Sequence, residues 1–145
     1  MPRYFTLREA RAALPAVGRD IRDAVQAKGR YQQADTLLTE LGQRILMRGG
    51  MMVDTVAAEA WKKQRESGAQ TLKATLGRIE NLGVVVKDLD VGLIDFPTLY
   101  RGQEVYLCWR MDEADIDFWH GTQEGFAGRK LIDSEFLSHH SGDSE

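Results

Sequence analysis

Two long apolar stripes with helical spacing, joined at Gly49-Gly50, constrain the fold of this chain more than any other feature. The first stripe opens on Thr6-Leu7-Arg8-Glu9, a capping box in which the Thr6 and Glu9 side chains each satisfy a backbone N–H of the other residue. The second stripe covers residues 52–81. Because glycines readily end helices, this pattern predicts a hairpin of two antiparallel helices over residues 6–82.

The apolar stripe of each predicted helix is interrupted near its middle by a polar stretch, at residues 26–33 and 62–70. These two stretches come to lie side by side when the chain folds back at the two glycines. Pro15 lies inside the first helix and is expected to kink or restart it, because proline lacks an N–H donor. So long a hairpin cannot bury its whole apolar stripe against itself, and a sheet or a second copy must cover the rest. We therefore expect a homodimer or another homo-oligomer.

The hydrophobic period changes after Gly83, from helical spacing to the patterns typical of strands. The β-branched run Val84-Val85-Val86 predicts a buried strand. Residues 93–100 and 103–110 predict two further strands, and Arg101-Gly102 between them predicts a tight turn because glycine tolerates positive φ.

The segment after these strands predicts less regular structure. An acidic run that starts at Asp112 favours a helix N-terminus and predicts a short helix through His120, followed by a loop. Residues 138–145 are polar and small, which predicts a disordered tail. We expect one α+β domain over residues 1–137: a long antiparallel helical hairpin (6–82) packed on a small, mainly antiparallel β-sheet with a short C-terminal helix (83–137).

The predicted turn sets the register of the two strands, because it pairs Tyr100 with Gln103 and Asp95 with Cys108. Side chains alternate between the two faces of a sheet, so a slip of one residue would exchange the faces. One face collects apolar side chains typical of a core, namely Ile94, Phe96, Val105, Leu107 and Trp109. The other face is mixed and collects Asp95, Pro97, Leu99, Glu104, Tyr106, Cys108 and Arg110.

The mixed face and the segment that follows it hold most of the side chains able to carry chemistry. Asp95 lies diagonal to Arg110 in this register, within reach of a salt bridge. The loop Gly125-Phe126-Ala127-Gly128-Arg129 could cradle an anion with its backbone N–H groups and its arginine. The candidate ligand-binding residues are Asp95, Tyr106, Cys108, Arg110, His120 and Arg129.

Each candidate also has a purely structural interpretation. Asp95 and Arg110 could form a structural ion pair, and Cys108 could be a buried strand residue. His120 could bind a metal ion with Asp95, Cys108 or Glu124, or it could be a packed histidine. The chain lacks the CxxC and HExxH spacings of specific zinc sites. Arg129 could pair with a local carboxylate, such as Asp95, Asp117 or Glu124.

Charge and composition argue against several classes of function. The net charge of −3, with both signs interspersed, gives no basic surface for nucleic acid or for an anionic membrane. The N-terminus lacks the apolar run of a signal peptide, and no apolar run is long enough to cross a bilayer. A single cysteine suits the reducing cytosol. We therefore expect a cytoplasmic protein without nucleic-acid or membrane partners.

Several blocks, spread over nearly the whole chain, share a family pattern. They are Tyr4-Phe5-Thr6-Leu7-Arg8-Glu9-Ala10 with Leu14-Pro15, Gly83-Val84-Val85-Val86-Lys87-Asp88-Leu89, Gly92-Leu93-Ile94-Asp95-Phe96-Pro97, Gly102-Gln103-Glu104-Val105-Tyr106-Leu107-Cys108-Trp109-Arg110, Trp119-His120 and Gly125-Phe126-Ala127-Gly128-Arg129. Together they resemble the prokaryotic family named domain of unknown function 2203. The resemblance implies no established activity or cofactor, so it assigns no catalytic residue.

Two functions follow from these observations. The first is a non-enzymatic module that binds a partner or self-associates through its long helices, and it requires an exposed apolar stripe at Leu37, Leu38, Leu41, Ile45, Val53, Val56 and Trp61. The second is a small-ligand, metal-binding or enzymatic site, which requires convergence of Asp95, Cys108, Arg110, His120 and Arg129. The sequence leaves the cofactor, the reaction and the question of enzymatic activity open.

Overall fold

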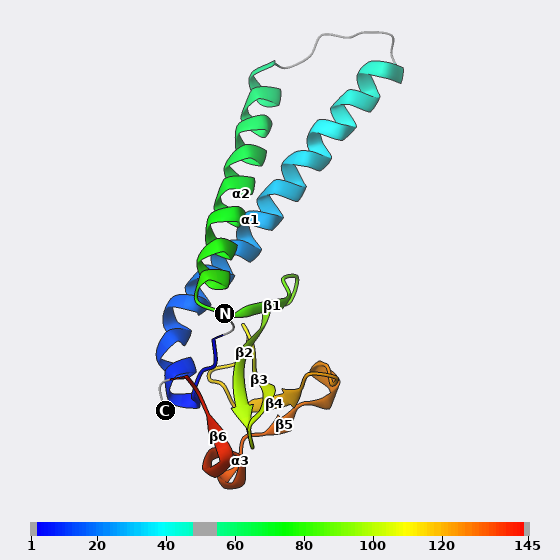
Figure 1. Ribbon diagram of the computed structural model, residues 1–145. Helices are drawn as coiled ribbons and strands as arrows, with labels where there is room; N and C mark the ends of the chain where they lie inside the picture. The colour runs from blue at the N-terminus through cyan, green and yellow to red at the C-terminus, as the bar shows by residue number, and fades with distance from the viewer. Residues whose placement is uncertain (1–2, 48–54, 144–145) are drawn as a thin grey trace. The chain divides into compact units, whose positions relative to one another are not determined.

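The computed structural model describes residues 3–47 and 55–143, and these form two compact units. One unit consists of residues 1–22 with 76–145, and the other of residues 23–75. The division therefore crosses both long helices instead of falling at Gly83, where the composition changes. Figure 1 gives the element labels.

The α+β class predicted from the sequence is confirmed. Helices α1 (Leu7–Met47) and α2 (Thr55–Asn81) precede an antiparallel sheet, and a short helix α3 (Ser134–His139) lies near the C-terminus. The loop with the two glycines and the start of the second predicted helix lie outside the described residues. Helix α1 continues through Pro15 without restarting, since buried Ala10 and Val17 on either side anchor it to the core.

The sheet is built from strands that follow one another along the chain. Strands β1 (Val85–Asp88), β2 (Leu93–Tyr100), β3 (Gln103–Arg110), β4 (Phe118–Gly121) and β5 (Lys130–Leu131) lie in sequence order, and β6 (His140–Ser141) pairs with β2. Both predicted strand ranges, and the register that pairs Asp95 with Cys108, are confirmed. Arg101 and Gly102 both have positive φ, as a tight two-residue turn requires.

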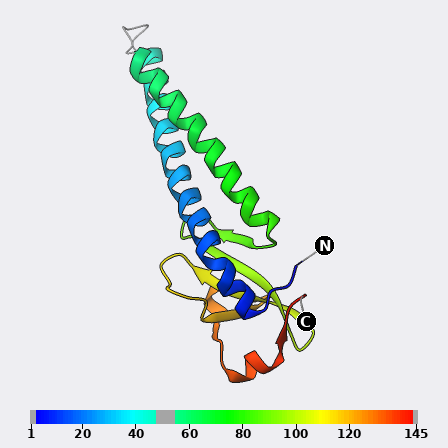
Figure 2. The same cartoon turned by 90° about the vertical axis from the view of Figure 1, so that its left-hand side faces the viewer.

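The core of this unit lies on the predicted apolar face of the sheet. The first turns of α1 lie against the strands (Figure 2). The capping box forms as predicted, because Thr6 N donates to Glu9 Oε1 at 2.9 Å and Glu9 N donates to Thr6 Oγ1 at 3.1 Å. The cluster brings together buried side chains from the N-terminal segment, α1, α2 and the sheet, including Phe5, Val17, Ile21, Ile79, Ile94, Phe96, Leu107 and Trp109.

Three local predictions are wrong. The run that starts at Asp112 forms turns and then strand β4 instead of a helix, because Phe118 and His120 share one face while Trp119 packs on the other against the core. The run Val84-Val85-Val86 does not form a fully buried strand: β1 lies at the sheet edge, where Val85 is exposed. Residues 138–143 are ordered, because α3 and β6 include most of them and Phe136 anchors this segment in the core.

The second unit contains the distal parts of both helices. Ala24, Ala27 and Ala34 are buried there, and a side chain at Gly68 would place its Cβ 2.9 Å from the Ala27 carbonyl oxygen. Gly68 therefore permits a close approach of the two helices within the polar stretch of the second predicted helix. Arg65 of this stretch pairs across the hairpin with Asp35, since Arg65 Nη1 lies 3.0 Å from Asp35 Oδ1.

Candidate functional site

Three adjacent strands bring Asp95, Cys108 and His120 together on the face of the sheet opposite the core. Asp95 on β2 lies directly opposite Cys108 on β3. His120 on β4 lies opposite Tyr106, two residues before Cys108, so it is the diagonal neighbour of the cysteine. The neighbouring positions of β2, β3 and β4 can be followed in Figure 1. Sheet register alone therefore places a carboxylate, a thiol and an imidazole side by side.

The three side chains form one buried polar cluster. Asp95 and Cys108 are fully buried and His120 is 4% exposed. His120 Nε2 lies 3.1 Å from Asp95 Oδ1 and 3.2 Å from Asp95 Oδ2. One potential ligand atom from each of the three side chains lies within 4.8 Å of the others. Such a group is stable in a protein interior only when its polar atoms satisfy one another or hold an ion.

The backbone fixes the protonation of one nitrogen of His120. Nδ1 lies 2.8 Å from the carbonyl oxygen of Gly121, and a carbonyl oxygen can only accept a hydrogen bond. Nδ1 therefore carries a proton, and Nε2 is the ring nitrogen that faces Asp95 and is free to offer its lone pair whenever the ring is neutral. Histidines that ligate metals are held in the same way, by donating from the other ring nitrogen to a carbonyl or carboxylate.

Burial shifts the protonation of the other two members toward their neutral forms. It raises the pKa of the Asp95 carboxyl, although His120 and Lys87 oppose the shift. It also raises the pKa of the Cys108 thiol to about 12, and the Asp95 charge acts in the same direction. Without an ion, the thiol therefore stays protonated at neutral pH and donates to Asp95.

The donor set fits a borderline-soft divalent cation. Zinc takes thiolate, imidazole and carboxylate ligands at about 2.0–2.3 Å, which places tetrahedral ligands roughly 3.3–3.8 Å apart. The atoms of this cluster lie within 4.8 Å of one another, so shifts of about 1 Å would close them around an ion. The Asp95–His120 pair is already at 3.1 Å.

Tyr106 lies beside this cluster, as the sequence predicts, whereas Arg110 does not. The Tyr106 ring is 5.5 Å from the His120 ring, between centroids, and its hydroxyl donates to Glu104. The prediction that Asp95 and Arg110 form a salt bridge is wrong. Arg110 instead pairs with Asp112, its Nη2 donating to Oδ2 at 3.0 Å, because the turn after β3 places that carboxylate closer.

Arg129 pairs with a carboxylate that the sequence does not single out. Its Nη2 lies 2.8 and 2.7 Å from the two oxygens of Glu113, so pairing with Asp95, Asp117 or Glu124 is wrong. Glu113 is well placed because its Oε1 also accepts from the backbone N–H of Arg110 at 2.8 Å. Phe126, in the loop before Arg129, is 40% exposed.

Sequence reasoning missed two contributors to the site. Lys87 on β1 lowers the pKa of Asp95 and lies 4.9 Å from the centre of the Tyr106 ring. The Gly121 carbonyl, which orients His120, is a backbone group that carries no sequence signal. Lys87 could not have been found by extending the register to β1, because a register shift between Val86 and Asp88 interrupts the regular alternation of faces at this residue.

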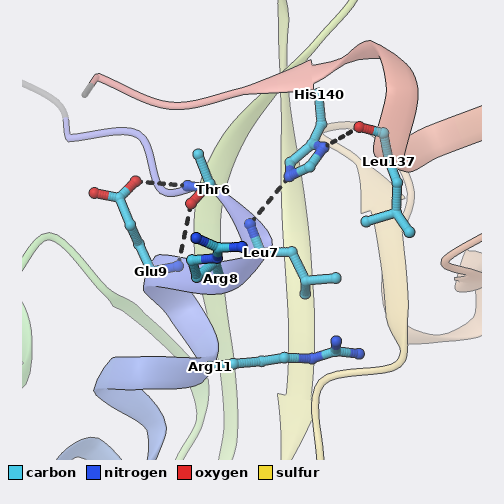
Figure 3. A pocket seen from close by; sticks show the side chains of 7 residues that line it. All are labelled: Thr6, Leu7, Arg8, Glu9, Arg11, Leu137 and His140. Atoms are coloured by element: carbon cyan, nitrogen blue, oxygen red, sulfur yellow. Dashed lines mark hydrogen bonds between the residues drawn. The ribbon is translucent and has the colours of Figure 1, made fainter. Parts of the chain in front are cut away.

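A surface pocket lies elsewhere in this unit, around the start of α1 (Figure 3). His140 accepts there from the Leu7 N–H at 3.1 Å and lies 2.9 Å from the Leu137 carbonyl through its other ring nitrogen. Arg11 extends along the pocket and pairs with Asp115. None of the six predicted site residues is among its lining residues, which are Thr6, Leu7, Arg8, Glu9, Arg11, Leu137 and His140.

The fold and the cluster define an α+β protein with a helical hairpin and a buried carboxylate–thiol–imidazole group on its sheet. The chain belongs to the DUF2203 family, described as an uncharacterized conserved protein, whose pattern it matches over residues 3–132. Searches of curated proteins and of solved structures found no match. No helix in residues 3–47 or 55–143 has both the length and the apolar character needed to cross a membrane.

Proposed function

We propose that this protein binds a divalent transition-metal ion through Asp95 Oδ, Cys108 Sγ and His120 Nε2. The observation that carries the proposal is the placement of three different ligand atoms within 4.8 Å on one buried face, with His120 already oriented by the Gly121 carbonyl. A metal ion would replace the thiol proton and the proton shared between Asp95 and His120, and would compensate the burial of both anionic ligands.

The ligand chemistry favours zinc-class ions over hard ions such as magnesium and calcium. Thiolate and imidazole prefer borderline and soft cations, whereas hard cations take oxygen ligands. Burial of all three side chains supports a retained ion with a structural or sensing role. A single cysteine, buried and free of disulfides, is consistent with a cytoplasmic location, which we also propose.

Cobalt binding tests this proposal directly, because a cobalt–thiolate bond absorbs in the near ultraviolet. The metal-free full chain is expected to bind one Co²⁺ with thiolate absorption, and zinc is expected to displace it. Cys108→Ser and His120→Ala are each expected to weaken binding by more than about 100-fold, beyond the loss typical of supporting residues. Affinity is expected to rise with pH, because the thiol has a pKa of about 12 and must lose its proton.

His139→Ala is the matched control, since His139 is an exposed histidine on α3 that lies outside the cluster. This variant is expected to bind cobalt as the unmodified chain does. Stoichiometric cobalt binding that survives both Cys108→Ser and His120→Ala, or no binding by the unmodified chain, would refute the proposal.

A second candidate function, self-association through the distal hairpin, is favoured by apolar exposure. Leu46, Met47 and Val56 are 83%, 87% and 79% exposed. They lie near the described ends of α1 and α2, beside a groove lined in part by Leu41 and Ile45. Of the other stripe residues named from the sequence, Leu37, Leu38 and Trp61 are half-buried, and Val53 lies outside the described residues.

We propose a second copy of this chain as the occupant of this surface. Both arms of one hairpin end expose apolar side chains, and a symmetric pair of copies would bury each set against the other. Full burial of one such side chain contributes roughly 1.5–3 kcal/mol, so two sets would outweigh the cost of ordering them.

Sedimentation of a dilution series measures this association. The unmodified chain is expected to be a dimer, and Leu46→Glu with Val56→Glu is expected to raise the dimer dissociation constant about tenfold or more, as loss of central interface contacts does. Leu131→Glu is the control, because Leu131 is 67% exposed but lies on β5 in the other unit. A monomer at all concentrations, or a dimer unaffected by the hairpin substitutions, would exclude this surface as the interface.

A further inference from the structure

Arg129 is a buried cation next to the cluster, with one N–H group that remains unsatisfied. Its side chain is 9% exposed, and its guanidinium carbon lies 4.0 Å from the centre of the Phe118 ring and 4.5 Å from that of Phe126. Nη2 binds Glu113, whereas Nε has no hydrogen-bond partner among the described residues. A buried donor without a partner costs about 1–3 kcal/mol, so this N–H group favours an acceptor.

Sheet register places this guanidinium on the thiol side of the cluster. Phe118 on β4 lies directly opposite Cys108 on β3, so the two side chains are neighbours on one face. Arg129 lies over the Phe118 ring, next to the strand position of Cys108. The cation therefore lies on the face of the sheet that carries the sulfur atom which the proposed metal would bind.

Three protein ligands leave one position of a tetrahedral ion unfilled. Structural zinc sites usually have four protein ligands, and sites with three take a water, a hydroxide or another exogenous ligand at the fourth. Among the described residues, the group of side chains placed to ligate a metal has three members, namely Asp95, Cys108 and His120. An exogenous ligand here would be small, because all three side chains are buried.

We propose that Arg129 Nε–H holds a small monoanion that completes the coordination of the metal at Asp95, Cys108 and His120. This inference rests on the proposed metal site. The guanidinium would supply an N–H donor that has no partner among the described residues and, beside Glu113, a positive charge. Phe118 and Phe126 cover the guanidinium, and the three ligand side chains are buried, so we expect a small anion such as hydroxide, a halide or azide.

Azide titration of the cobalt-loaded full chain tests this inference, with the visible cobalt spectrum as the readout. Azide is expected to change the spectrum of the unmodified protein saturably. Arg129→Gln is expected to raise the azide dissociation constant about tenfold or more, as loss of a charge-assisted hydrogen bond would. Arg129→Lys keeps the charge but loses the Nε donor, and an intermediate loss is expected. If Arg129→Gln fails to fold, Arg129→Lys alone still tests the inference.

Arg110→Gln is the matched control, because Arg110 is an arginine that also lies over Phe126, at 4.9 Å, but pairs with the exposed Asp112. Its azide affinity is expected to equal that of the unmodified chain. Two outcomes would overturn this inference and leave the metal proposal standing. One is cobalt binding without any azide response. The other is an azide affinity in both Arg129 variants that equals that of the unmodified chain. Absence of cobalt binding would overturn both.

Discussion

Substitution of Asp95 by alanine is expected to lower the free energy of unfolding of the metal-free protein by about 3–5 kcal/mol, the cost of breaking a buried polar pair. Asp95 is fully buried and faces His120 Nε2 with both oxygens, at 3.1 and 3.2 Å. Alanine would leave that nitrogen and the Cys108 thiol without their partner. Urea denaturation in the presence of a chelator measures the difference.

Asp95→Asn is the informative comparison, because it separates structural from metal-binding roles. His120 Nδ1 carries a proton for Gly121, so the asparagine amide can donate to Nε2 while its oxygen accepts from the thiol. We expect a loss of less than about 1.5 kcal/mol, the net value of a typical hydrogen bond. Cobalt binding is nevertheless expected to be lost with the carboxylate. Equal destabilisation by Asn and Ala would contradict this account of the hydrogen bonds.

Phe136→Ala is expected to cost about 3–5 kcal/mol of unfolding free energy, as truncation of a fully buried phenylalanine does. Phe136 on α3 is buried and stacks on Tyr100 at 5.2 Å between ring centroids. It also lies 4.9 Å from Trp119 and 5.3 Å from His140. The ring therefore fastens the C-terminal segment to β2 and β4, and its loss would free that segment.

The neighbouring Leu137 provides the control, because it is 47% exposed on the same helix. Leu137→Ala is expected to change the free energy of unfolding by less than about 0.5 kcal/mol, as surface substitutions do. Thermal or urea unfolding of both variants gives the comparison. Similar small losses for both positions would show that α3 contributes little to the fold.

The strand pair 93–110 can be predicted from sequence in full because local information determines it. A two-residue turn with glycine fixes the pairing, and alternation of apolar side chains then admits one register. The helices can be predicted equally well from the sequence, since their apolar stripes and the capping box are local patterns. The register of the strand pair is also sufficient to place Asp95 beside Cys108.

The rest of the site depends on contacts that are distant in the sequence. His120 joins the cluster only through β4, whose sequence predicts a helix because the acidic run before it resembles a helix start. Arg129 and Glu113 are 16 positions apart, and several carboxylates are equally plausible partners in the sequence. Likewise, α3 is stabilised by Asp133 at its N-cap and by Phe136, neither of which stands out in a polar segment.

The edge of β2 holds both ends of the described chain. The Phe5 N–H donates to Pro97 and β6 pairs with Tyr100, so the N- and C-terminal segments lie along the same strand. Tyr4 and Asp143 exchange two hydrogen bonds, each of 3.0 Å. A peptide link of a few residues would therefore cyclise the backbone without displacing either segment. The described part of the chain is thus suited to circular permutation, with the segments at Tyr4 and Asp143 joined and new ends opened in a surface loop.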